Sequence, residues 1–461
     1  MAPICESCGG TVLLETPAAQ AVSRSALEGL PPGVWRYRRF LPEIPNEDVV
    51  SLGEGGTPLL HAERLGRELG LRNLLIKDES RNPTGSFLDR GSTVLLSLAK
   101  QRGVDEVSCV TTGNLGASLA AYCAKAGVGA RIRVHPGIDR GKLYQMLAYG
   151  ADVESSTAPQ SKGGARTIAV TAGNPYLIEG EKTTGFEIMQ DLGWRTPDVM
   201  VIPVGTGGHL STVWRSVSLF REMGLVDASQ CRLIGVQVRA SPRPGYKRAG
   251  SRPAFEPGDL LLAELEESVP YFTQEASKAV SQSGGATLST TAAQTIESTR
   301  LLATTEGIFA EPSSASVVAA VEAAVRQGLV GASETVVCVV TGAGLKDTKA
   351  VSRLARETRK VPTVEPFALP SPKIGGTKLA LLRLLREGPS YGYELWLEIG
   401  KVRRMSTASV YQHLSELEGF SMVRKRGPIV AKGRERVPYE LTKRGADFLR
   451  IAARLETAEG V

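Results

Sequence analysis

The sequence predicts an α/β protein with largely parallel sheets, followed by a separate basic module at the C-terminal end. Between about residues 70 and 350, apolar runs of strand length alternate with segments of helical spacing. Such alternation is typical of βαβ units, in which helices connect parallel strands. Near residue 361 the pattern changes to a proline-rich stretch, and a helix-rich, charged segment follows it. We therefore expect two architectures within the 461 residues.

The bulk composition limits the classes of protein to which this chain can belong. Hydrophobic residues make up 42% of the sequence, which is ample for buried cores. No uncharged apolar run reaches about 18 residues, so we expect no membrane span. The N-terminus lacks the basic and apolar regions of a secretory signal. The six cysteines are scattered, mostly in apolar contexts, which indicates reduced thiols and a cytoplasmic location.

The positive charge of the chain is concentrated at its C-terminal end. The net charge is +7; from Lys373 onward there are 17 basic and 10 acidic residues, whereas positions 1–372 carry 38 of each. The last fifth of the chain therefore holds all of the excess. This asymmetry indicates a basic module with a polyanionic partner. A solvated basic surface without a partner is the alternative.

The first 20 residues contain one Cys-x-x-Cys pair, Cys5 and Cys8, followed by two glycines. The segment resembles half of a zinc ribbon. Tetrahedral zinc needs four ligands, and neither a second pair nor a histidine lies nearby. We expect a degenerate, metal-free remnant over residues 1–20. A zinc site completed by another subunit is the alternative.

Six strands and three helices are expected within the α/β region. Strand-like runs occupy residues 73–77, 107–111, 130–134, 199–204, 232–238 and 335–341, and helical spacing occupies 116–126, 209–222 and 312–326. Ligands of parallel sheets bind where the strands end at their carboxyl side. We therefore expect a site in the loops that follow these strands.

The loop after the first of these strands reads Asn82-Pro83-Thr84-Gly85-Ser86-Phe87-Leu88-Asp89-Arg90-Gly91. Asn-Pro and Gly are turn residues, and a helical pattern continues from the loop. A strand, a tight loop of small polar residues and a helix N-terminus together form a place for an anion or a polarised ligand.

Two further loops follow strands and lead into helices. The stretch Pro203-Val204-Gly205-Thr206-Gly207-Gly208-His209-Leu210 has glycines that allow backbone N–H groups to converge on a phosphate, and the following helix adds partial positive charge. The stretch Thr111-Thr112-Gly113-Asn114 precedes an alanine-rich helix, and Asn114 is also a good helix N-cap.

These three motifs, together with Glu306–Ala315 and Val340–Asp347, resemble in order and spacing those of threonine synthase and other fold type II pyridoxal-phosphate (PLP) enzymes. The resemblance implies a two-domain, tryptophan synthase β-like core over residues 21–360. In that family the first loop has a lysine that forms the Schiff base with PLP. Leu88 stands at that position here, while the other nine residues match. Lys77 is not an expected substitute, since the family has a lysine there as well.

The resemblance also implies roles for other residues. A leucine can neither form an imine nor carry a proton, so it implies no catalytic residue and PLP bound without a covalent link. Asn114 would face the 3′-oxygen of PLP, and Thr341 the pyridine nitrogen. The phosphate would be bound by Gly205, Thr206, Gly207, Gly208 and His209. On the substrate side lie Ser86, Asp89 and Glu311.

The C-terminal segment has the element order of a winged helix-turn-helix. Residues 361–372 carry four prolines and read as a stiff linker. Over residues 373–461 we expect two helices from Thr377 and Tyr391, a third over Ser406–Glu418, two β-like runs flanking a basic hairpin, and a last helix from Thr442. The whole segment is similar to PadR-type transcriptional regulators.

On that resemblance the third helix enters the major groove of double-stranded DNA. Its side chains would reach base edges or phosphates, and basic side chains of the wing would contact the backbone beside it. The residues concerned are Ser406, Thr407, Ser409 and Gln412 on the helix, and Arg424, Lys425, Arg426, Lys432, Arg434 and Arg436 around the wing. A winged helix that serves only for dimerisation is the alternative.

Three functions are compatible with these features. The first is a DNA-binding regulator whose threonine synthase-like domain is a scaffold or a sensor of PLP, an amino acid or a PLP–amino acid adduct. The second is a threonine synthase, or a related PLP enzyme, that is regulated by its winged helix and uses another base. The third is a structural partner of an active paralogue. A homodimer would present two winged helices to a palindrome.

Overall fold

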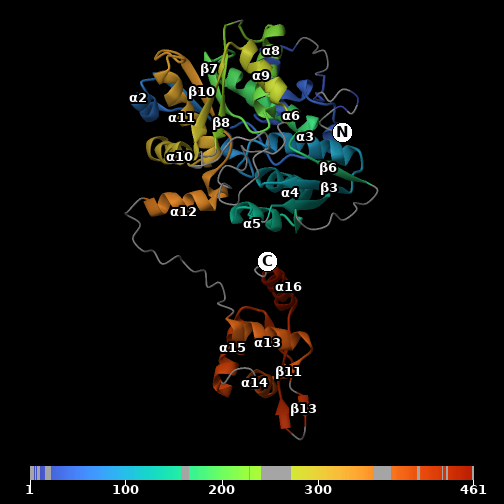
Figure 1. The fold of residues 1–461 in the computed structure, drawn as a ribbon. Helices are drawn as coiled ribbons and strands as arrows, with labels where there is room; N and C mark the ends of the chain where they lie inside the picture. Colours follow the sequence, from blue (N-terminus) through green and yellow to red (C-terminus); the bar gives the residue numbers. More distant parts are fainter. Residues whose placement is uncertain are drawn as a thin grey trace. The chain divides into compact units, whose positions relative to one another are not determined.

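The computed structural model describes residues 5, 7, 11–15, 22–135, 137–156, 166–227, 229–239, 271–357, 375–401, 405–427, 429–431 and 434–458. The chain divides into two compact units, Met1–Arg359 and Lys360–Val461, which are described separately (Figure 1). The predicted proline-rich linker, Cys8 and Lys432 lie outside the described residues.

Unit 1 contains two sheets. The larger has the order β1 (Leu59–His61), β2 (Asn73–Asp78), β10 (Thr335–Val340), β7 (Val199–Pro203), β8 (Arg232–Arg239), β9 (Ala286–Thr291). The smaller has the order β5 (Asp152–Ser155), β4 (Gly129–Val134), β3 (Glu106–Thr111), β6 (Thr167–Val170). All pairs are parallel except β1 with β2. The α/β prediction is confirmed, and each of the six expected strands forms.

Helices connect these strands, as the alternating sequence pattern predicts. They are α1 (Arg24–Glu28), α2 (Glu63–Leu69), α3 (Asp89–Gln101), α4 (Asn114–Ala126), α5 (Arg140–Ala148), α6 (Pro175–Glu181), α7 (Thr183–Asp191), α8 (Gly208–Glu222), α9 (Thr273–Gln282), α10 (Ala292–Glu306), α11 (Pro312–Arg326) and α12 (Thr348–Glu357). Short 3-10 turns are η1 (Val34–Phe40), η2 (Asn46–Asp48), η3 (Glu79–Arg81) and η5 (Gly344–Lys346). None of the helices among the described residues is long and apolar enough to cross a membrane.

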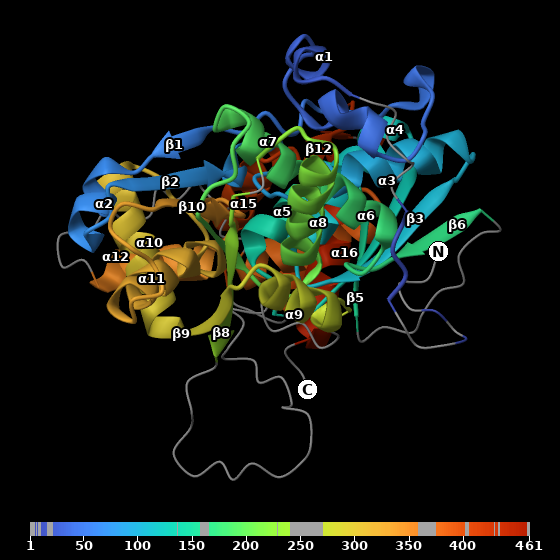
Figure 2. The same ribbon diagram turned by 90° about the horizontal axis from the view of Figure 1, so that it is seen from above.

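The larger sheet is covered on both faces, which explains why its central strands are continuously apolar. Along β7, Val199 and Val201 pack into the core on the α11 side, whereas Met200 and Ile202 pack with residues of α7 and α8. Figure 2 shows α10 and α11 on one side of the sheet and α7, α8 and α9 on the other. The loops that leave β2, β7 and β10 therefore emerge together at one edge.

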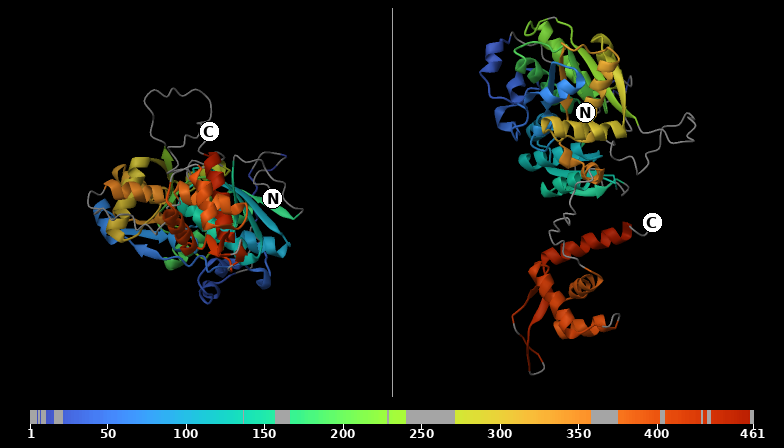
Figure 3. Two further views of the ribbon diagram at one scale, coloured as in Figure 1. Left: turned by 90° about the horizontal axis from the view of Figure 1, so that it is seen from below. Right: turned by 90° about the vertical axis from the view of Figure 1, so that its left-hand side faces the viewer.

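Unit 2 contains four helices and a β-ribbon among its described residues. Its helices are α13 (Gly376–Arg386), α14 (Gly392–Gly400), α15 (Thr407–Gly419) and α16 (Lys443–Ala458). An antiparallel sheet has the order β11 (Ser390–Tyr391), β15 (Pro438–Leu441), β12 (Val423–Lys425), and a separate hairpin pairs β13 (Ile429–Ala431) with β14 (Arg434–Arg436). This hairpin projects from the body of the unit (Figure 3). The elements are those of the predicted winged helix.

Leucines from three helices form the core of unit 2. Leu381 and Leu385 of α13, Leu395 of α14, and Leu414 and Leu417 of α15 are all buried in one cluster. The amphipathic spacing of these leucines explains the local helices. Burial of their common face then holds the helices together.

Candidate functional site

A pocket lies in unit 1 where the loops after β2, β3, β7 and β10 meet. It encloses about 780 Å³ of empty space, its open mouth included. The loops contribute both polar and apolar side chains to the surface of the pocket. The lining consists of Ser86, Phe87, Leu88, Thr111, Thr112, Asn114, Leu115, Ala172, Glu181, Pro203, Gly205, Thr206, Gly207, His209, Leu210, Ser313 and Thr341.

Backbone pairing fixes the loop that carries Leu88. The N–H of Phe87 donates to the carbonyl oxygen of Thr341 at 3.0 Å, and the N–H of Ala343 donates to that of Gly85 at 2.9 Å. The same segment also pairs with the turn before α11, since the N–H of Glu311 donates to the carbonyl oxygen of Gly342 at 3.0 Å. The loop is thereby connected to the end of β10, and Leu88 is positioned at the first turn of α3.

Asp89, predicted on the substrate side, is bound within this loop and is not among the residues that line the pocket. It is fully buried and accepts hydrogen bonds from the N–H and hydroxyl of Thr84, both at 2.7 Å, and from the hydroxyl of Ser118 at 2.6 Å. Burial raises the pKa of Asp89, although these hydrogen bonds oppose the shift. Its role is to close the loop onto α4.

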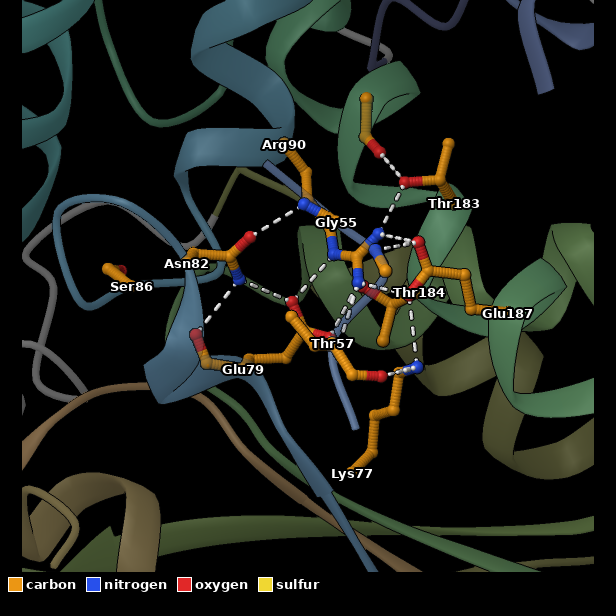
Figure 4. A network of polar contacts seen from close by, with 12 residues as sticks. Gly55, Thr57, Lys77, Glu79, Asn82, Ser86, Arg90, Thr183, Thr184 and Glu187 are labelled. Atoms are coloured by element: carbon orange, nitrogen blue, oxygen red, sulfur yellow. Dashed lines mark hydrogen bonds and ion pairs between the residues drawn. The ribbon is translucent and has the colours of Figure 1, made fainter. Parts of the chain in front are cut away.

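A buried charge network anchors the first turn of α3 from the other side (Figure 4). The guanidinium of Arg90 pairs with Glu79 at 2.6 Å and with Glu187 at 2.6 Å, and all three side chains are almost inaccessible. Lys77 pairs with Glu187 at 3.0 Å and with Asp191 at 2.9 Å. Burial alone would raise the pKa of Glu187, but the cations of Arg90 and Lys77 outweigh it and lower that pKa.

The same network of ion pairs and hydrogen bonds also fixes the position of Lys77. Its ammonium group donates to the carbonyl oxygen of Thr57 at 2.7 Å and is fully buried among acceptors. Lys77 does not belong to the pocket lining. Lys77 is therefore a member of the buried charge network.

His209 lies between the glycine-rich loop and the loop of Leu88. Its ring stacks on Phe87 with centroids 4.3 Å apart, and its Nε2 lies 3.2 Å from the hydroxyl of Thr184. Burial lowers the pKa of His209 to about 4, so the imidazole is neutral near pH 7. Among the described atoms its buried Nδ1 has no hydrogen-bond partner.

Behind the pocket wall, Asn114 is held by a carboxylate. Its Nδ2 donates to Oε2 of Glu311 at 2.7 Å, and Oε1 of Glu311 pairs with Lys142 at 2.9 Å. Glu311 is buried and does not line the pocket. Its hydrogen bond orients the amide of Asn114. The hydroxyl of Thr341, which lines the pocket, lies 2.8 Å from the hydroxyl of Ser314.

The glycine-rich loop fits a phosphate group. Gly207 has φ +88°, and a Cβ there would lie 2.8 Å from the carbonyl oxygen of Phe272, so only glycine suits this turn. The loop leads directly into α8, whose first N–H groups and partial positive charge favour an anion. Gly205, Thr206 and Gly207 line the pocket, whereas Gly208 packs against Ile178 and Phe272.

The structure thus brings most predicted ligand-binding residues together. Asn114, Gly205, Thr206, Gly207, His209, Thr341 and Ser86 share one pocket; Gly208, Asp89 and Glu311 lie outside its lining. Glu181, at the end of α6, also lines the pocket. The stretch from Glu179 to Thr184 resembles a segment that shapes the substrate side in the family, but the resemblance assigns no specific role to any of its residues. Packing of α6 on α3 brings Glu181 to the pocket. Among the described residues, no group of three or more His, Cys, Asp or Glu is arranged for a metal.

In unit 2, the residues of α15 that were predicted to contact DNA differ in their exposure to solvent. Ser406 caps the helix, since its hydroxyl accepts from the N–H of Ser409 at 3.3 Å. Gln412 is exposed on the side away from the core residues Val410 and Leu414, whereas Thr407 and Ser409 are half-buried. Exposed Ser415 shares the surface of Gln412. Residues on this face remain candidates for base contacts.

Arg424 and Lys425 of β12 (Val423–Lys425) and Arg426, which follows it, alternate between two faces. Arg424 and Arg426 both pair with the carboxylate of Glu440 on β15, whereas Lys425 pairs with Glu418 of α15 at 2.9 Å. Strand geometry requires this alternation. The three predicted DNA contacts of this segment therefore do not share one surface. Arg434 and Arg436 belong to β14 of the hairpin.

Comparisons with known proteins match each of the two units to a protein family. Residues 50–342 match the family model described as pyridoxal-phosphate dependent enzyme, and residues 381–451 match that of the PadR-like transcriptional regulators. The threonine synthase of Methanocaldococcus jannaschii is 36% identical over 77% of this chain and 92% of its own length. That of Methanosarcina acetivorans is 34% identical over 77% of this chain and 90% of its own.

Solved structures show the same fold at lower identity. Threonine deaminase isoform 2 from Solanum lycopersicum matches with a TM-score of 0.52 and 19% identity, over 76% of this chain and all of its own. A lysine-to-alanine mutant of O-ureido-L-serine synthase matches with a TM-score of 0.51 and 18% identity, over 68% of this chain and 94% of its own. The chain therefore belongs to the family of pyridoxal-phosphate-dependent enzymes, with threonine synthases among its relatives, and carries a PadR-like domain at its C-terminal end.

Proposed function

We propose that this protein is a DNA-binding transcriptional regulator whose threonine synthase-like domain has lost lysine chemistry and serves as a sensor of PLP and an amino acid. The observation that carries the proposal is Leu88, an alkyl side chain at the pocket wall where relatives would have the Schiff-base lysine. The described pocket lining contains no lysine at all. A winged helix in the same chain supplies an output for the sensor.

The residues of the pocket have binding roles in this proposal. Gly205, Thr206 and Gly207, at the start of α8, would hold the phosphate. Asn114, oriented by Glu311, and Thr341, beside Ser314, would hold the ring from its two edges. PLP itself supplies an electron-withdrawing ring and an aldehyde that combines with amines. Because Leu88 leaves the aldehyde position without a protein amine, an incoming amino acid would meet no competing lysine.

An adduct of PLP with an amino acid is thus a ligand to which this pocket is suited. The solved relative with lysine changed to alanine is described as holding O-ureido-L-serine. That description concerns the other protein, but it provides a chemical precedent for the proposal. Binding of the adduct would have to favour one DNA-binding state of the protein over another for regulation to result.

Two measurements on the full chain test the proposal. DNA from the protein's own promoter should be retarded at low salt, with affinity that falls as salt rises, and PLP with amino acids should change that affinity. Borohydride reduction after incubation with PLP should add no mass to any peptide of the wild type, whereas Leu88→Lys should gain a labelled lysine. A labelled lysine in the wild type, or no DNA binding at low salt, would contradict the proposal.

A second function is favoured by the threonine synthase relatives, which match over most of the α/β unit. The chain would then make threonine from phosphohomoserine under control of its winged helix. This reading needs a base other than lysine. Formation of threonine by the purified wild-type protein would establish it, and the same assay on Leu88→Lys shows whether the rest of the site is competent.

A further inference from the structure

A second cleft lies in unit 1, and its described lining shares no residue with the first pocket. It encloses about 950 Å³ of empty space, its open mouth included. Its walls come from the turn η1, from the loop that leads into β1, from β2 and from the C-terminal end of α7. The cleft is therefore large enough for a small molecule and does not include Leu88.

The apolar part of this cleft is largely aliphatic. Leu59 of β1, Leu75 of β2 and Leu192, which follows α7, line it. Each of these leucines is half-buried and packs against the core cluster that contains residues of β7, α7 and α8. Together they offer an aliphatic surface to the cleft, and burial of an aliphatic part of a ligand against this surface would be favourable.

Asp191 is the carboxylate of the cleft that remains open to a ligand. Its Oδ2 pairs with Lys77 at 2.9 Å, and its side chain is 38% exposed. Among the described residues its Oδ1 has no hydrogen-bond partner. The other carboxylate of the lining, Glu187, is occupied, because each of its oxygens accepts from Arg90, at 2.8 Å and 2.6 Å.

The charge network behind the cleft also favours a further cation at Asp191. It joins two cations, Lys77 and Arg90, to three carboxylates, Glu79, Glu187 and Asp191, so that the ionised groups leave one negative charge in excess. Asp191 is the exposed member of the network. Burial raises the pKa of Asp191, although Lys77 opposes the shift. An ammonium group that reaches Asp191 from the cleft would therefore stabilise its ionised form.

Arg36 supplies a cation to the same cleft. Its Nε and Nη2 donate to the carbonyl oxygen of Leu30 at 3.0 Å and 2.7 Å, and Nε also lies 3.2 Å from that of Pro31. These acceptors are uncharged, and Nη1 takes part in none of these bonds. Within the part of the chain that the structure describes, no carboxylate forms an ion pair with Arg36. A ligand carboxylate could therefore bind to this guanidinium.

The two charges and the aliphatic surface together define the ligand. A ligand with only a cation would be repelled by Arg36, and one with only an anion would be repelled by Asp191. We propose that this cleft is a site for a free α-amino acid with an aliphatic side chain, whose carboxylate pairs with Arg36 and whose ammonium group pairs with Asp191. The side chain lies on the three leucines. This site goes beyond the proposed function and depends on neither Leu88 nor PLP.

Calorimetric titration of the full chain without PLP, with L-leucine as the probe, tests this inference. We expect the wild type to bind L-leucine at least about tenfold more tightly than L-leucinamide, which lacks the carboxylate, or N-acetyl-L-leucine, which lacks the ammonium group. The reason is that each analogue loses one hydrogen bond between charged groups. Absence of L-leucine binding, or equal affinity for L-leucine and either analogue, would overturn the inference.

Substitutions locate the site. Arg36→Gln should weaken L-leucine about tenfold but L-leucinamide less than about twofold, because the amide has already lost the charge that Arg36 pairs with. Asp191→Asn retains an acceptor for Lys77 and should weaken L-leucine about tenfold but N-acetyl-L-leucine less than about twofold. Arg39→Gln is the matched control: it lies on the same turn, is exposed and is outside the cleft lining, so it should alter neither affinity.

A change in the first pocket separates this inference from the proposed function. Leu88→Lys should leave the affinity for L-leucine within about twofold of the wild type. A larger effect of Leu88→Lys than of Arg36→Gln would place the amino acid in the first pocket and overturn the inference. The comparison of L-leucine with its analogues on the wild type decides the matter even where Asp191→Asn folds poorly. None of these measurements involves PLP or DNA, so a negative result leaves the sensor proposal standing.

Discussion

At the scale of single residues, Leu88 is an apolar side chain in a loop that is held in place by hydrogen bonds and ion pairs. Backbone pairing to Thr341, the hydrogen bonds of Asp89 and the ion pairs of Arg90 all fix its position. The protein therefore keeps the scaffold that would place a lysine at this point. Under the proposed function, an alkyl side chain at this point changes the chemistry of the pocket, whereas the contacts that hold the loop stay in place.

Arg90 should be far more important for stability than an exposed arginine. We expect Arg90→Met to lower the free energy of unfolding of the α/β unit by about 3–5 kcal/mol, because Glu79 and Glu187 would remain buried without their cation. Arg166→Met is the matched control, since its pair with Asp105 is largely exposed, and it should cost less than about 1 kcal/mol. Urea unfolding measures both. Similar losses would show that the buried network is not the main anchor.

His209 should make the α/β unit sensitive to acid. Its pKa is lowered to about 4 in the fold by burial, whereas the unfolded value is about 6.5. Between these values the unfolded chain binds more protons, so stability falls as the pH drops below 6.5. We expect the wild type to lose about 1.5 kcal/mol more than His209→Gln when the pH falls from 6.5 to 5. Urea unfolding at both pH values provides the comparison, and parallel losses in the two proteins would contradict it.

At the scale of elements, close helix crossings determine both sites. Gly180 lets α6 meet α3, which places Glu181 in the pocket. Gly392 has the same function in unit 2, because a Cβ there would lie 2.5 Å from the ring of Tyr411, and α14 can then pack on α15. In both cases a missing side chain on one helix allows a close approach to a neighbouring helix.

The two faces of β12 should differ in DNA binding. Arg424 and Arg426 share the single carboxylate of Glu440 and retain a surplus positive charge, whereas Lys425 is balanced by Glu418. We expect Arg424→Ala and Arg426→Ala each to weaken DNA binding and to reduce the salt slope by about 1. Lys425→Ala should change neither. Gel retardation across a salt series measures the affinity for DNA and its salt dependence. A larger effect of Lys425→Ala than of the two arginine substitutions would assign the face of Lys425 to DNA.

At the scale of the whole molecule, two units with different charge lie in one chain. The excess positive charge lies from Lys373 onward, within the unit that matches the PadR-like family. The α/β unit is balanced in charge and matches metabolic enzymes. This division of charge favours a protein in which one unit binds a small ligand and the other binds a polyanion. A homodimer on a palindrome stays a prediction.

The sequence by itself determined the strands and helices, the loops that form the pocket and the division of charge. These features depend on local periodicity, turn residues and motif order, which are readable along the chain. Only the tertiary structure decided that Glu181 enters the pocket while Asp89, Gly208 and Glu311 stay outside its lining. The physical reason is that side-chain partners and helix crossings join residues far apart in sequence. Asp89 meets Ser118, Glu311 meets Asn114, and Gly180 meets Arg90 through contacts that no local pattern encodes.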